Sequence, residues 1–173
     1  MISTKTRRNY ENQFKTPKYI LDEISGFYNG HIDLDPCIPI YSDSKEKYAQ
    51  VEFNVLDDGL DRDWTKYRTI FLNPPYSLIL PWVEKSLNTI DQGDDNTILI
   101  LLPSPSSVCK WSNLLFPEIM SLVYFNHTIH FNISPNRSFV NVLVLLSNKK
   151  EKEALMAWFK QCFTKFGTVL NGR

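Results

Sequence analysis

Long hydrophobic runs are absent from this 173-residue sequence. No apolar stretch approaches the roughly 20 residues that a membrane-spanning helix needs. The N-terminal segment also lacks the apolar region of a secretory signal peptide. These absences argue against a membrane or secreted protein, and we expect an intracellular, cytoplasmic one.

Cysteine is scarce as well. The three cysteines, Cys37, Cys109 and Cys162, form neither an even disulfide set nor a spacing typical of metal ligands. His127 and His130 add no metal-ligand pattern. We therefore expect free thiols in a reducing compartment and no metal site.

The chain has no excess of charge, because 19 basic residues balance 19 acidic ones. Their distribution is uneven, however. Residues 1–13 are polar and contain Lys5, Arg7 and Arg8, so we expect a flexible basic segment that can contact phosphates. Residues 14–173 are expected to form one domain, since a hydrophobic content of 43% fits a packed globular protein.

Hydrophobic patterning predicts strands that alternate with helices. Such alternation favours an α/β fold with a mainly parallel, twisted sheet and helices on both of its faces. Tryptophans 82, 111 and 158 lie on expected helices and are predicted to be core residues. The expected strands are 31–34, 51–55, 69–72, 97–102, 120–125 and 140–146, and the expected helices are 17–26, 78–90, 108–116 and 151–163.

Ligands of such sheets bind outside the carboxyl ends of the strands. Residues 33–37, 73–76 and 103–106 follow expected strands, so we predict that these three segments meet at one edge of the sheet.

The tetrapeptide Asn73-Pro74-Pro75-Tyr76 follows a short apolar strand directly. Two consecutive prolines permit neither a helix nor a continuing strand, so the chain must form a rigid loop there. The loop holds an amide oxygen, a proline carbonyl and an aromatic ring close together. The two oxygens can accept hydrogen bonds from an exocyclic amine while the ring stacks on the planar group that carries it.

This tetrapeptide resembles motif IV of the S-adenosylmethionine-dependent amino-methyltransferases. The ordered set of motifs along residues 14–146 looks like that of the small phage-type, Dam-like DNA adenine-N6 methyltransferases. The set comprises Phe14-Lys15-Thr16-Pro17, Asp33-Leu34-Asp35-Pro36-Cys37, Asp58-Gly59-Leu60 with Trp64, and Phe71 to Ser77. The resemblance implies a Rossmann-like class I methyltransferase fold and methyl transfer to the N6 amine of a flipped-out adenine in double-stranded DNA.

The resemblance also implies roles for individual residues. Asn73, Pro74, Pro75 and Tyr76 would form the catalytic loop, with S-adenosylmethionine as the methyl donor and no metal. Thr16 also suits a helix N-cap, with Pro17 at the first helical position. The glycine-rich turn that commonly follows Asp-Pro in these enzymes is replaced here by Ile38-Pro39-Ile40. The residues implied in cofactor binding are Thr16, Pro17, Asp33, Asp35, Pro36, Asp57 and Asp58.

Alternatives stay open from the sequence alone. Cytosine-N4 methylation uses a very similar tetrapeptide, and enzymes that methylate RNA bases or protein glutamine share it. A non-catalytic subunit of the same fold is a further alternative. Because little of the chain remains for a recognition domain, we expect recognition by residues 37–50, residues 126–139, the basic N-terminus or a second protomer or subunit.

Overall fold

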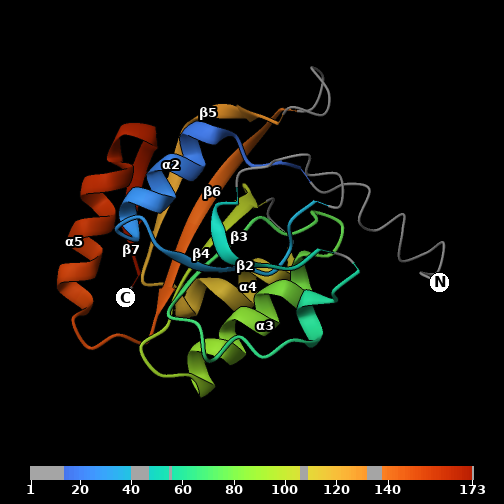
Figure 1. Cartoon of the computed structure of the whole chain (residues 1–173). Helices are drawn as coiled ribbons and strands as arrows, with labels where there is room; N and C mark the ends of the chain where they lie inside the picture. The colour runs from blue at the N-terminus through green and yellow to red at the C-terminus, as the bar shows by residue number, and fades with distance from the viewer. Residues whose placement is uncertain (1–13, 40–46, 55, 106–108, 132–137, 173) are drawn as a thin grey trace.

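The computed structural model describes residues 14–39, 47–54, 56–105, 109–131 and 138–172, without the side chains of residues 138 and 139. Over these ranges the chain forms one seven-stranded sheet with the order β2-β1-β3-β4-β6-β5-β7 (Figure 1). The strands are β1 Ile32–Asp35, β2 Ala49–Glu52, β3 Thr69–Leu72, β4 Thr97–Pro103, β5 Ser121–His130, β6 Ser138–Ser147 and β7 Gly167–Asn171.

The sheet has a parallel half and an antiparallel half. β2, β1, β3 and β4 pair in parallel, as the alternation of strands and helices predicts. β6 runs antiparallel to both β4 and β5, and β7 runs antiparallel to β5. The prediction of a mainly parallel sheet is therefore only partly met. The reason is that β5 and β6 are consecutive strands paired in antiparallel, a pairing that needs no crossover helix.

Helices cover both faces of the sheet. α2 (Lys18–Phe27) and α5 (Lys152–Phe163) pack on one face, while α3 (Ile79–Gln92) and α4 (Lys110–Leu115) pack on the other (Figure 1). Strand β4 contributes to both cores, because Leu99 and Leu101 belong to the first cluster and Ile98 and Ile100 to the second. This double burial explains why β4 reads as a continuous apolar run.

The first helix starts differently from the prediction. Pro17, with an extended backbone (φ −58°, ψ 145°), is the N-cap of α2, and its carbonyl accepts hydrogen bonds from the N–H groups of Ile20 and Leu21. Thr16 is therefore not the N-cap. Its side chain is buried and turns toward the loop after β3, where it takes part in the site described below.

Other differences lie at the C-terminal end and in β2. Trp158 is 37% exposed, so its assignment to the core was wrong, whereas Trp82 and Trp111 are buried as predicted. The indole N–H of Trp158 donates to the carbonyl of Phe27 and thereby joins α5 to α2. Strand β7 was not predicted, and β2 begins two residues before the expected position.

None of the helices in the described ranges is long and apolar enough to cross a membrane.

Candidate active site

Two of the three predicted loop segments come together at the carboxyl edge of the parallel strands. Asp35 ends β1 and Asn73 follows β3, and because β1 and β3 are parallel neighbours, both line one pocket. In the third segment, Pro103 ends β4 opposite Asn141 of β6, and Ser106 lies outside the described residues. The antiparallel strand β6 thus brings an additional side chain to the same edge.

The amide of Asn73 is held in one orientation. Its Nδ2 donates to the carbonyl of Phe14 at 2.8 Å and to the hydroxyl of Thr16 at 3.1 Å. A carbonyl oxygen only accepts, so the amide nitrogen must face Phe14 and Oδ1 must face the other way. Oδ1 is buried and has no hydrogen-bond partner within the described part of the chain. The loop thus presents a desolvated acceptor, which is destabilising unless a ligand supplies a donor.

The two prolines fix the position of that acceptor. Pro74 and Pro75 are buried, and the carbonyl of Pro75 accepts a hydrogen bond from Leu78 directly before α3. The turn is therefore tied at one end to β3 and at the other to a helix. Such a loop positions the amide group with little freedom of the backbone.

Tyr76 lies half-buried beside this loop. Its ring makes edge contacts with Phe14 and Phe131, with centroids 5.6 and 6.2 Å apart. Its hydroxyl accepts a hydrogen bond from Nδ2 of Asn141 at 2.5 Å. Burial raises the pKa of the Tyr76 phenol well above its ordinary value, although the Asn141 bond lowers it in part. Tyr76 is therefore a neutral aromatic group with a fixed ring.

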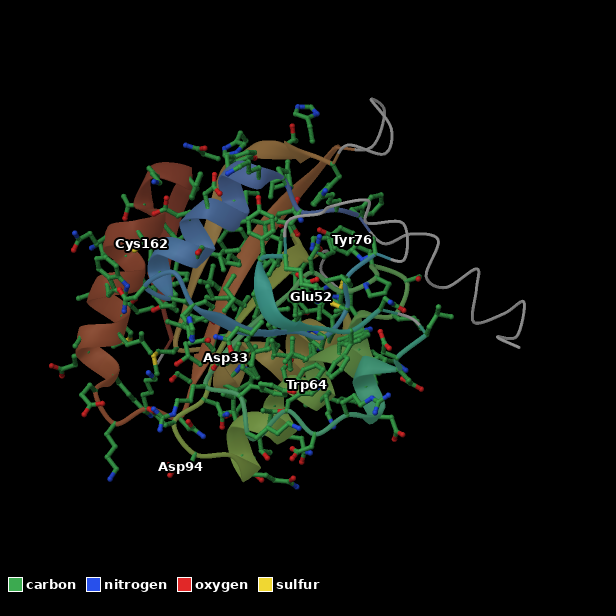
Figure 2. The ribbon with its side chains drawn as sticks, in the orientation of Figure 1. Asp33, Glu52, Trp64, Tyr76, Asp94 and Cys162 are labelled. Atoms are coloured by element: carbon green, nitrogen blue, oxygen red, sulfur yellow. The ribbon has the colours of Figure 1, made fainter. Side chains whose placement is uncertain are left out.

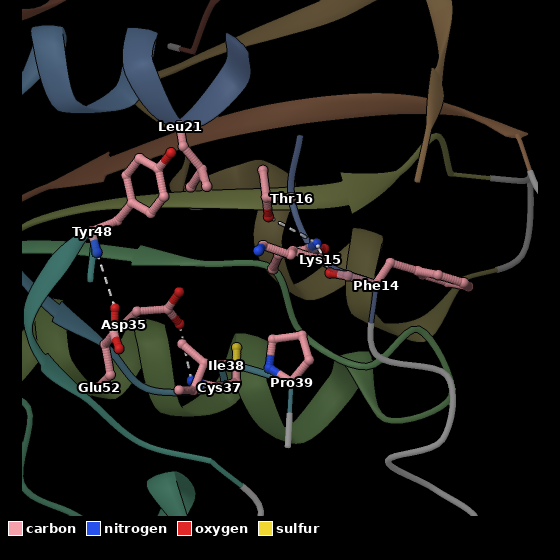
Figure 3. Close-up of a pocket in the computed structure, with 11 residues that line it drawn as sticks. Phe14, Lys15, Thr16, Leu21, Asp35, Cys37, Ile38, Pro39, Tyr48 and Glu52 are labelled. Carbon is pink, nitrogen blue, oxygen red and sulfur yellow. Dashed lines mark hydrogen bonds between the residues drawn. The ribbon is translucent and has the colours of Figure 1, made fainter. Parts of the chain in front are cut away.

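The pocket beside Asn73 carries two carboxylates, from Asp35 and from Glu52 at the end of β2 (Figure 3). Burial, and secondarily the charge of Glu52, raise the pKa of Asp35 to about 7, although hydrogen bonds from Cys37 oppose the shift. A cationic ligand that also offers hydroxyl groups would satisfy this lining. The pocket is lined by Phe14, Lys15, Thr16, Leu21, Asp35, Cys37, Ile38, Pro39, Tyr48, Glu52 and Asn73.

The thiol of Cys37 lies in the wall of this pocket. Burial, and secondarily the charge of Asp35, raise its pKa well above the ordinary value, so it stays a neutral thiol. A neutral, buried thiol is a poor nucleophile.

Asp33 lies elsewhere. Its carboxylate accepts hydrogen bonds from the backbone N–H groups of Arg68 and Thr69, at the start of β3. It thus binds at the amino-terminal start of β3, away from Tyr76 (Figure 2), and is not among the residues that line the pocket. The structure gives Asp33 a role in joining β1 to β3.

Asp57 and Asp58 are also outside the described lining of the pocket. Oδ2 of Asp57 accepts from the backbone N–H of Asn54, and Asp58 has a left-handed backbone (φ 48°) directly before a short 3₁₀ turn, Gly59–Asp61. A contact with the adenosine part of a cofactor stays a prediction for both. Pro17 and Pro36 are buried beside Thr16 and Asp35 without lining the pocket themselves.

Gly59 of the Asp58-Gly59-Leu60 motif packs against the backbone of Pro36, next to the pocket, and Trp64 binds Gly59. A Cβ atom on Gly59 would lie 2.0 Å from the carbonyl oxygen of Pro36, so only glycine allows this approach. The indole N–H of the fully buried Trp64 donates to the carbonyl of Gly59 at 2.8 Å. The motif therefore fixes the turn that follows Asp35.

Sequence reasoning missed two polar side chains of this edge, Glu52 and Asn141. A carboxylate at the end of the strand beside β1 was a usable signal for Glu52. No local pattern marks Asn141, because its role depends on the pairing of β6 with β4. Among the described residues, no group of three or more His, Cys, Asp and Glu side chains could hold a metal ion.

This chain is similar to known proteins over most of its length. Residues 3–169 match the model of the family described as DNA N-6-adenine-methyltransferase (Dam). The DNA N-6-adenine-methyltransferase of Haemophilus phage HP1 is 26% identical over 130 residues, which are 74% of this chain and 70% of the phage protein. The enzyme of the same name from Escherichia phage T1 is 31% identical over 104 residues, 60% of this chain and 41% of the phage protein. The chain belongs to the Dam family of DNA N-6-adenine-methyltransferases.

Proposed function

We propose that this chain transfers a methyl group from S-adenosylmethionine to the N6 amine of an adenine flipped out of DNA, and that Asn73 and Pro74 hold the amine. The observation that carries the proposal is the buried, unpaired Oδ1 of Asn73, oriented by the Phe14 carbonyl and the Thr16 hydroxyl. An exocyclic amine offers the two hydrogens that this loop can accept.

The two acceptors would act on the reacting nitrogen. Oδ1 of Asn73 and the carbonyl of Pro74 would each accept one amine hydrogen and so direct the nitrogen lone pair toward the methyl donor. As the new N–C bond forms and the bond between the methyl carbon and the sulfonium sulfur breaks, the nitrogen would become positive and the donor would leave as the neutral thioether. The two preorganised dipoles would stabilise the charge on the nitrogen. The methylated nitrogen would then lose one proton to solvent.

The residues of the pocket fit the methyl donor. S-adenosylmethionine, when bound, supplies an electrophilic methyl group on a sulfonium sulfur, together with an ammonium group and ribose hydroxyls. Asp35 would pair with a positive group and Glu52 would accept from hydroxyls, with Thr16 in the same lining. Pro17 and Pro36 would act by holding the backbone beside Thr16 and Asp35. The pocket has a volume of about 40 Å³ among the described residues, against roughly 300–1,000 Å³ for typical small-molecule sites, so the whole donor would not fit within it.

Tyr76 would hold the base. An adenine must leave the duplex to reach the loop, at a cost of a few kcal/mol. Stacking on the Tyr76 ring would return roughly 1–3 kcal/mol per base. Since Oδ1 of Asn73 is shielded from solvent, the entering base must displace part of the surrounding wall.

The site of action follows from the substrate. We propose that the chain works on double-stranded DNA inside a bacterial cell, which is consistent with the phage origin of both relatives.

Asn73→Ala tests the proposal directly, with Asn96→Ala as a matched control. Asn96 is also a fully buried amide that donates to two backbone carbonyls, those of Thr65 and Tyr67, but it lies at the opposite edge of the sheet. Single-turnover methylation should fall by about 10²–10³-fold in Asn73→Ala. Binding of S-adenosylmethionine, measured by calorimetry, should weaken far less than the rate falls, because Asn73 is one of eleven residues that line the pocket.

The control should lower the melting temperature and keep the methylation rate. Unchanged single-turnover methylation by folded Asn73→Ala would overturn the proposed role of the loop.

A further inference from the structure

Asn141 is the second buried amide at the catalytic edge. It lies near the start of β6, opposite Pro103 at the end of β4, and its side chain is fully buried. Its Nδ2 donates to the carbonyl of Leu102 at 3.0 Å and to the hydroxyl of Tyr76 at 2.5 Å. One side chain thus connects the sheet with the aromatic residue of the catalytic loop.

The orientation of this amide is also determined by its partners. The Leu102 carbonyl only accepts, so Nδ2 must face it, and the second N–H then reaches the Tyr76 hydroxyl. Oδ1 is left buried, without a partner among the described residues. An apolar side chain at this position would avoid that unfavourable burial. The position therefore needs a side chain that donates hydrogen bonds. Of the two groups that accept from Asn141, the Tyr76 hydroxyl is the one that lies in the site.

The Tyr76 ring is consequently restrained from several sides. Its backbone follows the rigid Pro74-Pro75 turn, Phe14 and Phe131 contact the ring, and Asn141 binds its far end. A stacking surface with a fixed plane reduces the ordering that an incoming base must undergo.

We propose that Asn141 is a positioning residue for the methyl transfer: its hydrogen bond to the Tyr76 hydroxyl fixes the plane of the ring on which the flipped base stacks. This inference rests on the proposed role of Tyr76. Asn141 itself touches no reacting atom.

A double-mutant cycle with Asn141→Ala and Tyr76→Phe tests the inference. Tyr76→Phe keeps the ring and removes the hydroxyl. Each single variant should lower the single-turnover rate by about 10- to 100-fold. Each should also reduce the fluorescence increase of 2-aminopurine placed at the target adenine, with little change in S-adenosylmethionine affinity. The double variant should be no slower than the slower single variant, because both changes remove the same contact.

Asn96→Ala again serves as the control for loss of a buried amide, and melting temperatures are measured for all variants. If Asn141→Ala does not fold, Asn141→Ser replaces it, since one short hydroxyl cannot bridge Leu102 and Tyr76. Additive rate losses, or a rate loss only in proportion to the fall in melting temperature, would overturn the inference. An unaffected Tyr76→Ala would instead show that the proposed role of Tyr76 is wrong.

Discussion

Asn73, in the Asn-Pro-Pro-Tyr loop, and Asn141, which binds Tyr76 of that loop, each bury an amide oxygen that has no hydrogen-bond partner within the described residues. In each case a backbone carbonyl, that of Phe14 or Leu102, fixes the orientation of the amide. Unpaired buried acceptors are unfavourable for folding and are expected mainly where a ligand or a mechanism requires them. At the scale of single residues, the site is thus organised by the orientation of two amides.

Asp35 leads to a prediction about pH. Its pKa of about 7 means that, in the chain without cofactor, the carboxyl group is largely protonated below that pH. Pairing with an ammonium group requires the ionised carboxylate of Asp35. Below pH 7, Asp35 must therefore release its proton when S-adenosylmethionine binds. Affinity for S-adenosylmethionine should therefore rise by up to about tenfold per pH unit between pH 5.5 and 7 and level off above.

Calorimetry across this range, for wild type and Asp35→Asn, measures the effect. Asp35→Asn should bind weakly and with little dependence on pH. A wild-type affinity that falls as the pH rises toward 7 would contradict the assignment of Asp35 to the cofactor.

At the scale of the elements, the turn after β1 depends on a glycine from another segment. Gly59→Ala should push the Gly59–Asp61 turn away from Pro36, because the new Cβ would lie 2.0 Å from the Pro36 carbonyl oxygen. We expect a loss of about 1–3 kcal/mol in the free energy of unfolding and weaker binding of S-adenosylmethionine, since Asp35 precedes this turn.

Gly26→Ala is the matched control. A Cβ on Gly26, in α2, meets nothing within 4 Å, and alanine is the better helix former, so the melting temperature should hold or rise. Equal melting temperatures and affinities in Gly59→Ala and wild type would show that the Asp-Gly-Leu motif does not support the pocket.

Elements with strong hydrophobic patterning could be predicted from the sequence. β3, β4 and α3 were expected within one or two residues of their observed bounds. β7, with its short and mostly exposed sequence, has no pattern of its own and exists because it pairs with β5. The start of α2 was misjudged because Thr16 suits an N-cap locally, whereas its tertiary contact with Asn73 places it elsewhere.

The candidate site was predictable to a similar degree. Asn73, Tyr76 and Asp35 stand in local motifs that follow strands, so their meeting at one edge followed from parallel topology. Asn141 and Glu52 contribute through strand pairing and a shared pocket, which one sequence does not show. Asp33 stands in a motif, but its carboxylate binds the neighbouring strand.

At the scale of the whole molecule, the described residues form one sheet with helices on both of its faces. Residues 40–46 and 132–137, which include much of the segments expected to read DNA, lie outside the described residues, as do residues 1–13. Recognition by these segments or by a second protomer stays a prediction.

Deletion of residues 1–12 tests whether the basic N-terminus contributes to DNA binding, since it removes Lys5, Arg7 and Arg8. The dissociation constant for double-stranded DNA should rise at low salt. The slope of log K against log salt concentration should become less steep by roughly 2–3, because each lost phosphate contact accounts for about 0.9. Fluorescence anisotropy with a labelled duplex measures both quantities, and an unchanged slope would remove the N-terminus from DNA binding.

The most direct test of the central claim is the chemical identity of the methylated product. The wild-type chain is incubated with unmethylated double-stranded DNA and S-adenosylmethionine labelled in its methyl group, and the DNA is then digested to nucleosides and separated. We predict label in N6-methyladenine, and a loss of that label with Asn73→Ala but not with Asn96→Ala. Label in N4-methylcytosine, or N6-methyladenine formed equally well by Asn73→Ala, would contradict the account.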